Sequence, residues 1–186
     1  MGTMDHRSFE EMGIPPGYGF KQLLFSPVAN ALVLQTCPAD DAWRPERLYF
    51  RPVGAYKYTP IGKPAYLVSQ ESPFVHSSKP LLAYNSMEHK FSLDADGRER
   101  HSADWRSFEV ASLESGLTVR SAHPDSLRLP SGFHHGWICE VVAFGDSGIF
   151  VKVGLSEDRS RFQYFIAELD DADMLKPITE LPAAFM

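Results

Sequence analysis

Cysteine and long apolar runs are both scarce in this 186-residue chain. The only two cysteines, Cys37 and Cys139, lie about a hundred residues apart, whereas small disulfide scaffolds carry more cysteines at shorter spacings. Cys139 falls in the apolar run 137–142, where we expect a buried thiol. No run approaches the ~18 apolar residues of a membrane span, and residues 1–12 lack the basic and apolar regions of a signal peptide. We therefore expect a cytoplasmic protein without a membrane segment.

Positive charge is also in short supply. Eighteen Lys and Arg residues stand against 24 Asp and Glu residues, a formal net charge of −6. Non-specific binding to nucleic acid needs a cationic surface, so the composition argues against a nucleic-acid partner. A negative surface suits a basic protein partner instead.

Catalytic motifs are absent as well. The chain has no Gly-x-Ser-x-Gly, Gly-x-Gly-x-x-Gly, Walker or His-Glu-x-x-His motif. Residues 94–97 (Asp-Ala-Asp-Gly) resemble the start of a calcium loop, but Arg98 and Arg100 occupy positions that would need oxygen ligands. We interpret 94–97 as a solvated hairpin loop and Gly-Asp-Ser-Gly at 145–148 as a second hairpin. We thus predict no catalytic residue, no metal site and no cofactor.

One group of residues keeps an enzymatic alternative open. His134 and His135 are adjacent, and Glu140 follows shortly after them. Adjacent residues on a strand point to opposite faces, so the two histidines would not chelate one metal ion. The alternative function is a small hydrolase or lyase that uses a His/Glu acid–base pair in a propeller-type cleft.

Aromatic and turn-forming residues are plentiful. Thirteen Phe and seven Tyr favour half-buried strands, and 14 Pro with 13 Gly favour turns. We predict a mainly β fold of antiparallel sheets, with short helices only at 9–12 and 170–175. Apolar alternation and turn signals predict strands at 21–25, 31–36, 47–53, 65–69, 80–85, 90–93, 105–113, 117–121, 137–144, 149–155 and 161–169. In the last two strands, the residues expected to be buried are Ile149, Val151, Phe165 and Ala167.

A loose internal repeat of about 55 residues underlies these strands. Each unit has a turn, an apolar strand, a loop and an alternating strand that ends in a short apolar piece. We place the units at 21–70, 71–122 and 130–182 within a single β-rich domain, 21–186. Residues 1–20 are interpreted as an N-terminal extension.

The repeat resembles the TolB-like and WD40-like β-propeller repeats. The resemblance is carried by Phe-Ser-Pro at 25–27 with the strand 31–35, by Ser-Pro at 72–73 with 81–86, and by Glu-Ser-Gly-Leu-Thr at 114–118. It covers most of the chain after residue 20 and implies propeller-like blades, although the Gly-His and Trp-Asp signature is absent. Three blades are too few for a closed ring. The array would therefore be open or completed by dimerisation, and a β-sandwich is the alternative fold.

Acidic residues recur in the expected loops, two of which also carry a Trp. Asp40, Asp41 and Trp43 lie in the first loop between strands, and Asp94, Asp96, Asp104 and Trp105 border the equivalent second loop. The densest acidic run follows the last strong strand. Carboxylates beside an exposed Trp are typical of an interface for a cationic partner. The predicted partner-binding residues are Asp40, Asp41, Trp43, Asp170, Asp171 and Asp173.

These features favour a binding protein over an enzyme. A small, acidic β-protein without catalytic motifs resembles in type the immunity proteins that bacteria make against their own toxins. The resemblance implies a non-catalytic, stoichiometric binder or inhibitor of another protein, such as a basic toxin or effector enzyme. A homodimer, or a subunit that supplies blades to a larger ring, remains an alternative.

Overall fold

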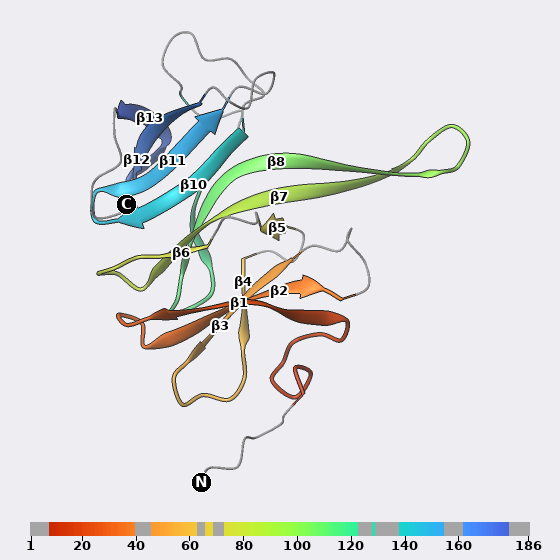
Figure 1. Cartoon of the computed structure of the whole chain (residues 1–186), viewed down its shortest axis with the longest axis horizontal. Coiled ribbons are helices and arrows are strands. Elements are labelled where there is room, and N and C mark those ends of the chain that lie inside the picture. The colour runs from red at the N-terminus through yellow and green to blue at the C-terminus, as the bar shows by residue number, and fades with distance from the viewer. Residues whose placement is uncertain are drawn as a thin grey trace.

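The computed structural model describes residues 8–39, 46–62, 66–68, 73–122, 128, 138–154 and 162–178. Across these residues the chain forms thirteen strands and no helix. The strands make three antiparallel sheets that follow one another along the chain (Figure 1). The prediction of a mainly β, antiparallel fold is confirmed.

Each sheet is a meander, in which neighbouring strands are consecutive or nearly so. The N-terminal sheet has the order β1 (Tyr18–Ser26), β2 (Ala31–Pro38), β3 (Arg47–Pro52) and β4 (Thr59–Ile61). The middle sheet has the order β5 (Tyr66–Val68), β7 (Leu81–Leu93), β8 (Glu99–Ser112) and β9 (Thr118–Ala122), and β6 (Phe74–Val75) also pairs with β7. The C-terminal sheet has the order β10 (Ile138–Gly145), β11 (Gly148–Gly154), β12 (Phe162–Glu168) and β13 (Asp171–Ile178).

The middle sheet is buried on both faces because it lies between the other two. Ala83 and Val110 belong to a cluster with the C-terminal sheet, whereas the adjacent positions Leu82 and Ala111 belong to a cluster with the N-terminal sheet. Successive residues of a strand point to opposite faces, so β7 and β8 each contribute to two cores. The fold is thus a three-layer stack whose sheets, within the described residues, do not close into a ring.

The C-terminal hairpins follow the predicted alternation. Ile149 lies opposite Ala167 and Val151 opposite Phe165, and all four are fully buried. The 145–148 turn joins β10 to β11 as expected. Gly148 has a φ of 130°, and a Cβ there would overlap the carbonyl oxygen of Ala167. The burial pattern predicted for this region is confirmed.

The N-terminal segment folds back over the N-terminal sheet. The amide of Met12 donates to the carbonyl of Ser8, and the amide of Ile14 donates to that of Phe9. Ile14 is buried with Leu34 and Tyr49 on the face of this sheet that points away from the middle sheet. The helix predicted at 9–12 is wrong. Prolines at 15 and 16 follow at once, so the segment stops after a turn.

Two other predictions need correction. The helix expected at 170–175 is instead the start of β13, because Leu175 pairs with Ala167 and is buried in the core. The strands expected at 80–85 and 90–93 are one strand, β7, which continues through a register shift between Asn85 and Met87. Together β7 and β8 extend beyond the body of the molecule as a long hairpin (Figure 1). Its tip is the loop predicted at 94–97, where Asp94 accepts hydrogen bonds from the amides of Asp96 and Arg98.

Candidate functional site: a partner-binding surface

The structure describes only some of the predicted binding residues. Asp40, Asp41 and Trp43 lie between β2 and β3, outside the described residues. Asp170 is exposed in the turn between β12 and β13. Asp171 and Asp173 are the first and third residues of β13, where the structure describes only the backbone.

The order of the strands assigns the two groups of predicted residues to different connections. Connections in an antiparallel meander alternate between the two ends of the strands. The 40–45 connection is the second in its sheet, and the turn at Asp170 is the third in its own. The turn at 94–98 joins the second and third strands of the β5-β7-β8-β9 path, so it is equivalent to 40–45. The first two acidic loops therefore occupy equivalent places in their sheets, and the acidic run at Asp170 does not.

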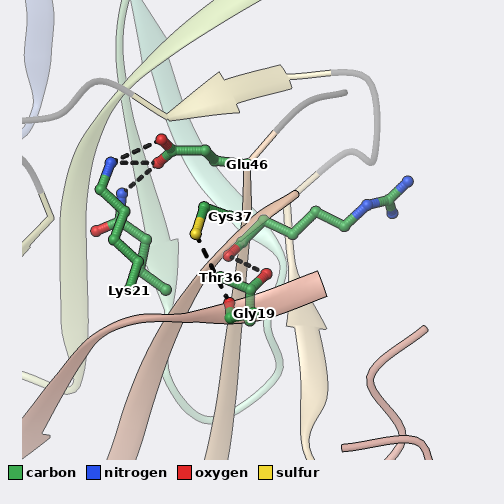
Figure 2. Close-up of polar contacts among 7 residues, drawn as sticks. Gly19, Lys21, Thr36, Cys37 and Glu46 are labelled. Carbon is green, nitrogen blue, oxygen red and sulfur yellow. Dashed lines mark hydrogen bonds and ion pairs between the residues drawn. The ribbon is translucent and has the colours of Figure 1, made fainter. Parts of the chain in front are cut away.

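A polar cluster lies where the 40–45 connection enters β3. Figure 2 shows the ammonium of Lys21 against the carboxylate of Glu46, with Nζ–O distances of 2.6 and 2.7 Å. Gln35 donates a third hydrogen bond to the same carboxylate at 2.7 Å. Gln35 is almost fully buried, and its Oε1 has no partner among the described residues. The Glu46 carboxylate is thus held by a cation and a buried amide from two neighbouring strands.

Lys21 reaches this cluster because β1 contains a bulge. The register passes from Phe20 opposite Thr36 to Gln22 opposite Gln35, which leaves Lys21 as the extra residue. An inserted residue shifts the alternation of the strand by one position. As a result Phe20, Leu23 and Phe25 all lie on one face of the sheet, although their spacing does not follow a regular alternation.

We call Phe20, Leu23 and Phe25 the β1 strip. They are exposed by 59, 46 and 52%, respectively. Their cross-strand partners are Thr36, Leu34 and Leu32, which identifies the face as the one pointing away from the middle sheet. Single exposed apolar side chains are common, but three on one face of one strand form a surface that usually has a partner.

The N-terminal turn covers the middle of this face and leaves the β1 strip uncovered. Ile14 packs against Leu34, the residue opposite Leu23, and is itself 1% exposed. The same turn carries Glu10 and Glu11, both exposed. The outer face of the N-terminal sheet thus carries an apolar strip on β1 and a turn with two exposed carboxylates.

A second polar group, which the sequence did not reveal, joins the middle and C-terminal sheets. His76 is fully buried and its Nδ1 accepts hydrogen bonds from the amides of Ser78 and Lys79, each at 3.1 Å. Its ring meets Phe144 edge-on, with the centroids 4.6 Å apart. The Nε2 atom has no hydrogen-bond partner among the described residues and lies 3.8 Å from the carboxylate of Asp146. Burial lowers the pKa of His76, more than the nearby Asp146 charge raises it.

These residue types resemble a catalytic triad, but their geometry does not. Ser78 Oγ donates to Asp146 and not to His76. The Nδ1 atom, which in a triad is oriented by a carboxylate, already accepts two backbone amides. We therefore interpret the group as a structural link between the β6–β7 turn and the β10–β11 hairpin.

Of the three residues of the enzymatic alternative, the structure describes only Glu140. His134 and His135 lie outside the described residues. Glu140 is partly buried on β10, and its carboxylate is 3.7 Å from the ammonium of Lys152. Over the described parts of the chain, no three His, Cys, Asp or Glu side chains gather as a metal site would require.

Comparison with known proteins adds no relative. No protein-family model matches the chain, and no curated protein matches it. In the described segments there is no helix long and apolar enough to cross a membrane.

Proposed function

We propose that this chain is a non-catalytic protein-binding module, a cytoplasmic stoichiometric binder or inhibitor of another protein such as a toxin or effector enzyme. The observation that carries the proposal is the β1 strip. Three large apolar side chains are about half exposed on one face of an edge strand. Such a surface promotes aggregation unless another protein covers it. A partner that covers them accounts for their retention at the surface.

The charge of the chain supports a basic partner. The formal net charge is −6, and Glu10, Glu11 and Asp170 are exposed. Carboxylates at the rim of an interface speed association with a cationic protein, while buried aromatic side chains slow its dissociation. The predicted loop residues Asp40, Asp41 and Trp43 belong to a connection of the same sheet as the β1 strip and would extend this rim. Asp170, Asp171 and Asp173 belong to the C-terminal sheet and would contact the partner at a separate place.

We further propose that the three sheets are propeller-like blades of an open array. The outer two blades are four-stranded antiparallel meanders, the middle blade has a path of four strands with β6 as a fifth, and the sheets stack face to face. A second copy that completed the ring would have to place a blade against the outer face of the N-terminal sheet. Ile14 already occupies that face with Leu34 and Tyr49, so we favour the open array over a dimeric ring.

Co-purification from the native cell tests the binding function. We expect tagged protein to recover one partner at a fixed molar ratio. The double variant Leu23→Thr/Phe25→Thr should lose this partner, since it removes two apolar anchors while keeping residues that favour strands. The matched control is Leu117→Thr, because Leu117 is 68% exposed but lies in the turn between β8 and β9.

The outcome is decided by the comparison of variants. Loss of the partner with Leu23→Thr/Phe25→Thr, and retention with Leu117→Thr, supports the proposal. Equal recovery with both variants, or no stoichiometric partner for the unaltered chain, contradicts it. If the partner is an enzyme, its activity should fall to a minimum at one equivalent of this chain.

A further inference from the structure

We propose that β1 binds its partner by strand addition: an extended strand of the partner protein pairs with the open edge of β1 and continues the N-terminal sheet. The inference rests on the proposed binding function and specifies the kind of partner segment that the β1 strip accepts. It concerns the backbone of β1 as well as its side chains.

The backbone of β1 is available along one edge. β1 is the first strand of the N-terminal sheet and pairs only with β2 among the described strands. In an antiparallel strand, every second residue directs its amide and carbonyl away from the neighbouring strand. Between Phe20 and Ser26 the described structure contains no backbone hydrogen bond to any strand except β2. Among the described residues, the peptide groups on the other edge of β1 are thus unpaired and could pair with an added strand.

The first strands of the other two sheets are protected, which sets β1 apart. In the middle sheet, β5 and β6 have only three and two residues, and short strands are a common way to blunt an edge. In the C-terminal sheet, the buried side chain of Asn85 accepts a hydrogen bond from the amide of Val141 on β10 at 2.7 Å. β1 has nine residues, and no side chain in the described part of the chain caps its backbone between Phe20 and Ser26.

Charge and the bulge protect only the first part of β1. Natural proteins blunt edge strands with lysines, bulges and inward-pointing charges, and β1 has these devices only at Lys21, so the edge from Gln22 to Ser26 carries none of them. The only charged residue of β1 is Lys21, and its ammonium is bound to Glu46 at the inner side of the sheet. The bulge that turns Lys21 inward also aligns the β1 strip beside the open edge.

The occupant that fits best is a partner strand with alternating apolar residues and flanking lysines or arginines. Apolar side chains on the outer face of this strand would lie beside the β1 strip, and the body of the partner protein would pack over both sets of side chains. Basic flanks would complement the net charge of −6. A second copy fits less well, since β1–β1 pairing would double the width of the exposed apolar strip instead of covering it and would bring two acidic chains together.

A synthetic peptide provides the probe. We would use a peptide of about ten residues, enough to span a strand such as β1, with alternating valine and threonine between pairs of lysines. Binding is measured by fluorescence anisotropy, and amide hydrogen exchange is measured by NMR with and without the peptide. We expect every second amide between Phe20 and Ser26 to gain at least about tenfold protection. The same peptide with proline at two central positions should not bind, because proline lacks the amide needed for pairing.

The variants separate the strand-addition proposal from the binding function. Phe25→Thr should weaken peptide binding about tenfold or more, and Leu117→Thr should leave it unchanged. Absence of peptide binding, or binding without alternating protection, overturns strand addition. In either case the binding function still stands if the native partner is lost with Leu23→Thr/Phe25→Thr. A concentration-dependent dimer that Phe25→Thr abolishes would also overturn it, in favour of pairing between copies of this chain.

Discussion

Buried polar side chains mark the places where sheets and strands meet. Glu109 on β8 accepts hydrogen bonds from the hydroxyls of Tyr84, at 2.6 Å, and Thr118, at 3.3 Å. His76 and Asn85 connect the middle sheet to the C-terminal sheet. A buried polar group without a hydrogen-bond partner lowers the stability of the fold, and a hydrogen bond to a partner requires a particular direction. These residues therefore hold adjacent strands and sheets in a defined alignment, which apolar contacts alone do less well.

His76 should make the fold sensitive to acid. Because burial lowers its pKa below 6.5, the unfolded chain binds a proton near pH 6.5, and the folded chain binds it only at lower pH. The contribution of His76 to the free energy of unfolding is therefore complete above pH 6.5 and is lost as the pH falls toward the folded pKa. We expect His76→Gln to reduce this loss, as measured by urea unfolding at several pH values from 7.5 to 5.

Asp146 provides the control for this effect. Its carboxylate raises the pKa of His76, opposing the burial. Asp146→Asn should lower that pKa further and widen the pH window in which stability is lost. Identical pH dependence in His76→Gln and the unaltered protein would show that His76 is not the group responsible.

Phe165 should be among the most costly side chains to truncate. It is fully buried on β12, opposite Val151 and within the cluster between the middle and C-terminal sheets. Phe165→Ala would remove most of a large ring from a closed core and should lower the free energy of unfolding by about 3–5 kcal/mol. Urea denaturation measures this loss. Phe162→Ala on the same strand is the matched control, since Phe162 is half exposed and should cost much less.

At the scale of strands, bulges decide which residues face which surface. Register shifts occur where β1 pairs with β2, β7 with β8 and β10 with β11, and the extra residue lies on β1, β8 and β10, respectively. The shift in β1 aligns the β1 strip, and the shift between β7 and β8 follows Asn85, which reaches across to β10. A polar contact lies beside each shift. Without the extra residue, the groups that make this contact would point in another direction.

Removal of the Asn85 side chain should expose the edge of β10. Asn85→Ala would leave the buried amide of Val141 without its acceptor and should cost about 1–3 kcal/mol. Ser86→Ala is a suitable control, because Ser86 is equally buried but its hydroxyl has no partner among the described residues. Hydrogen exchange at Val141 should accelerate in Asn85→Ala more than in Ser86→Ala. Equal acceleration in the two variants would contradict the capping role.

At the scale of the whole molecule, the two cores share one sheet. Both faces of the middle sheet are buried only when both outer sheets are present, because alternate residues of β7 and β8 serve different clusters. We expect one cooperative unfolding transition. Phe165→Ala in one core and Phe50→Ala in the other should each shift that whole transition, as followed by circular dichroism. Two separate transitions, each moved by only one variant, would contradict this coupling.

Residues 8–14 should act as the end cap of the stack. Ile14 is 1% exposed against Leu34 and Tyr49. Ile14→Ala should cost about 2–4 kcal/mol and increase binding of an apolar dye to the outer face of the N-terminal sheet. Val28→Ala, at an exposed turn position, should do neither. A native-like melting temperature for Ile14→Ala would mean that the segment is not needed as a cap.

Features that depend on a few adjacent residues were predictable from the sequence. The turns at 94–97 and 145–148, most strand positions and the buried face around Ile149 and Phe165 follow from turn chemistry and period-two alternation. These are local signals, because a residue's preference for a turn or for a strand face acts within a few positions along the chain.

Other features exist only because distant strands meet. The alternation around Phe20, Leu23 and Phe25 contains no sign of the bulge, which is a property of the pairing of β1 with β2. The short acidic segment before Leu175 favours a helix by itself, but pairing with β12 and burial of Leu175 make it a strand. The sequence alone thus determined that the chain is a β-protein with particular turns. Tertiary structure decided which edge stays open and which side chains face outward, because both depend on hydrogen bonds and burial between residues far apart in the chain.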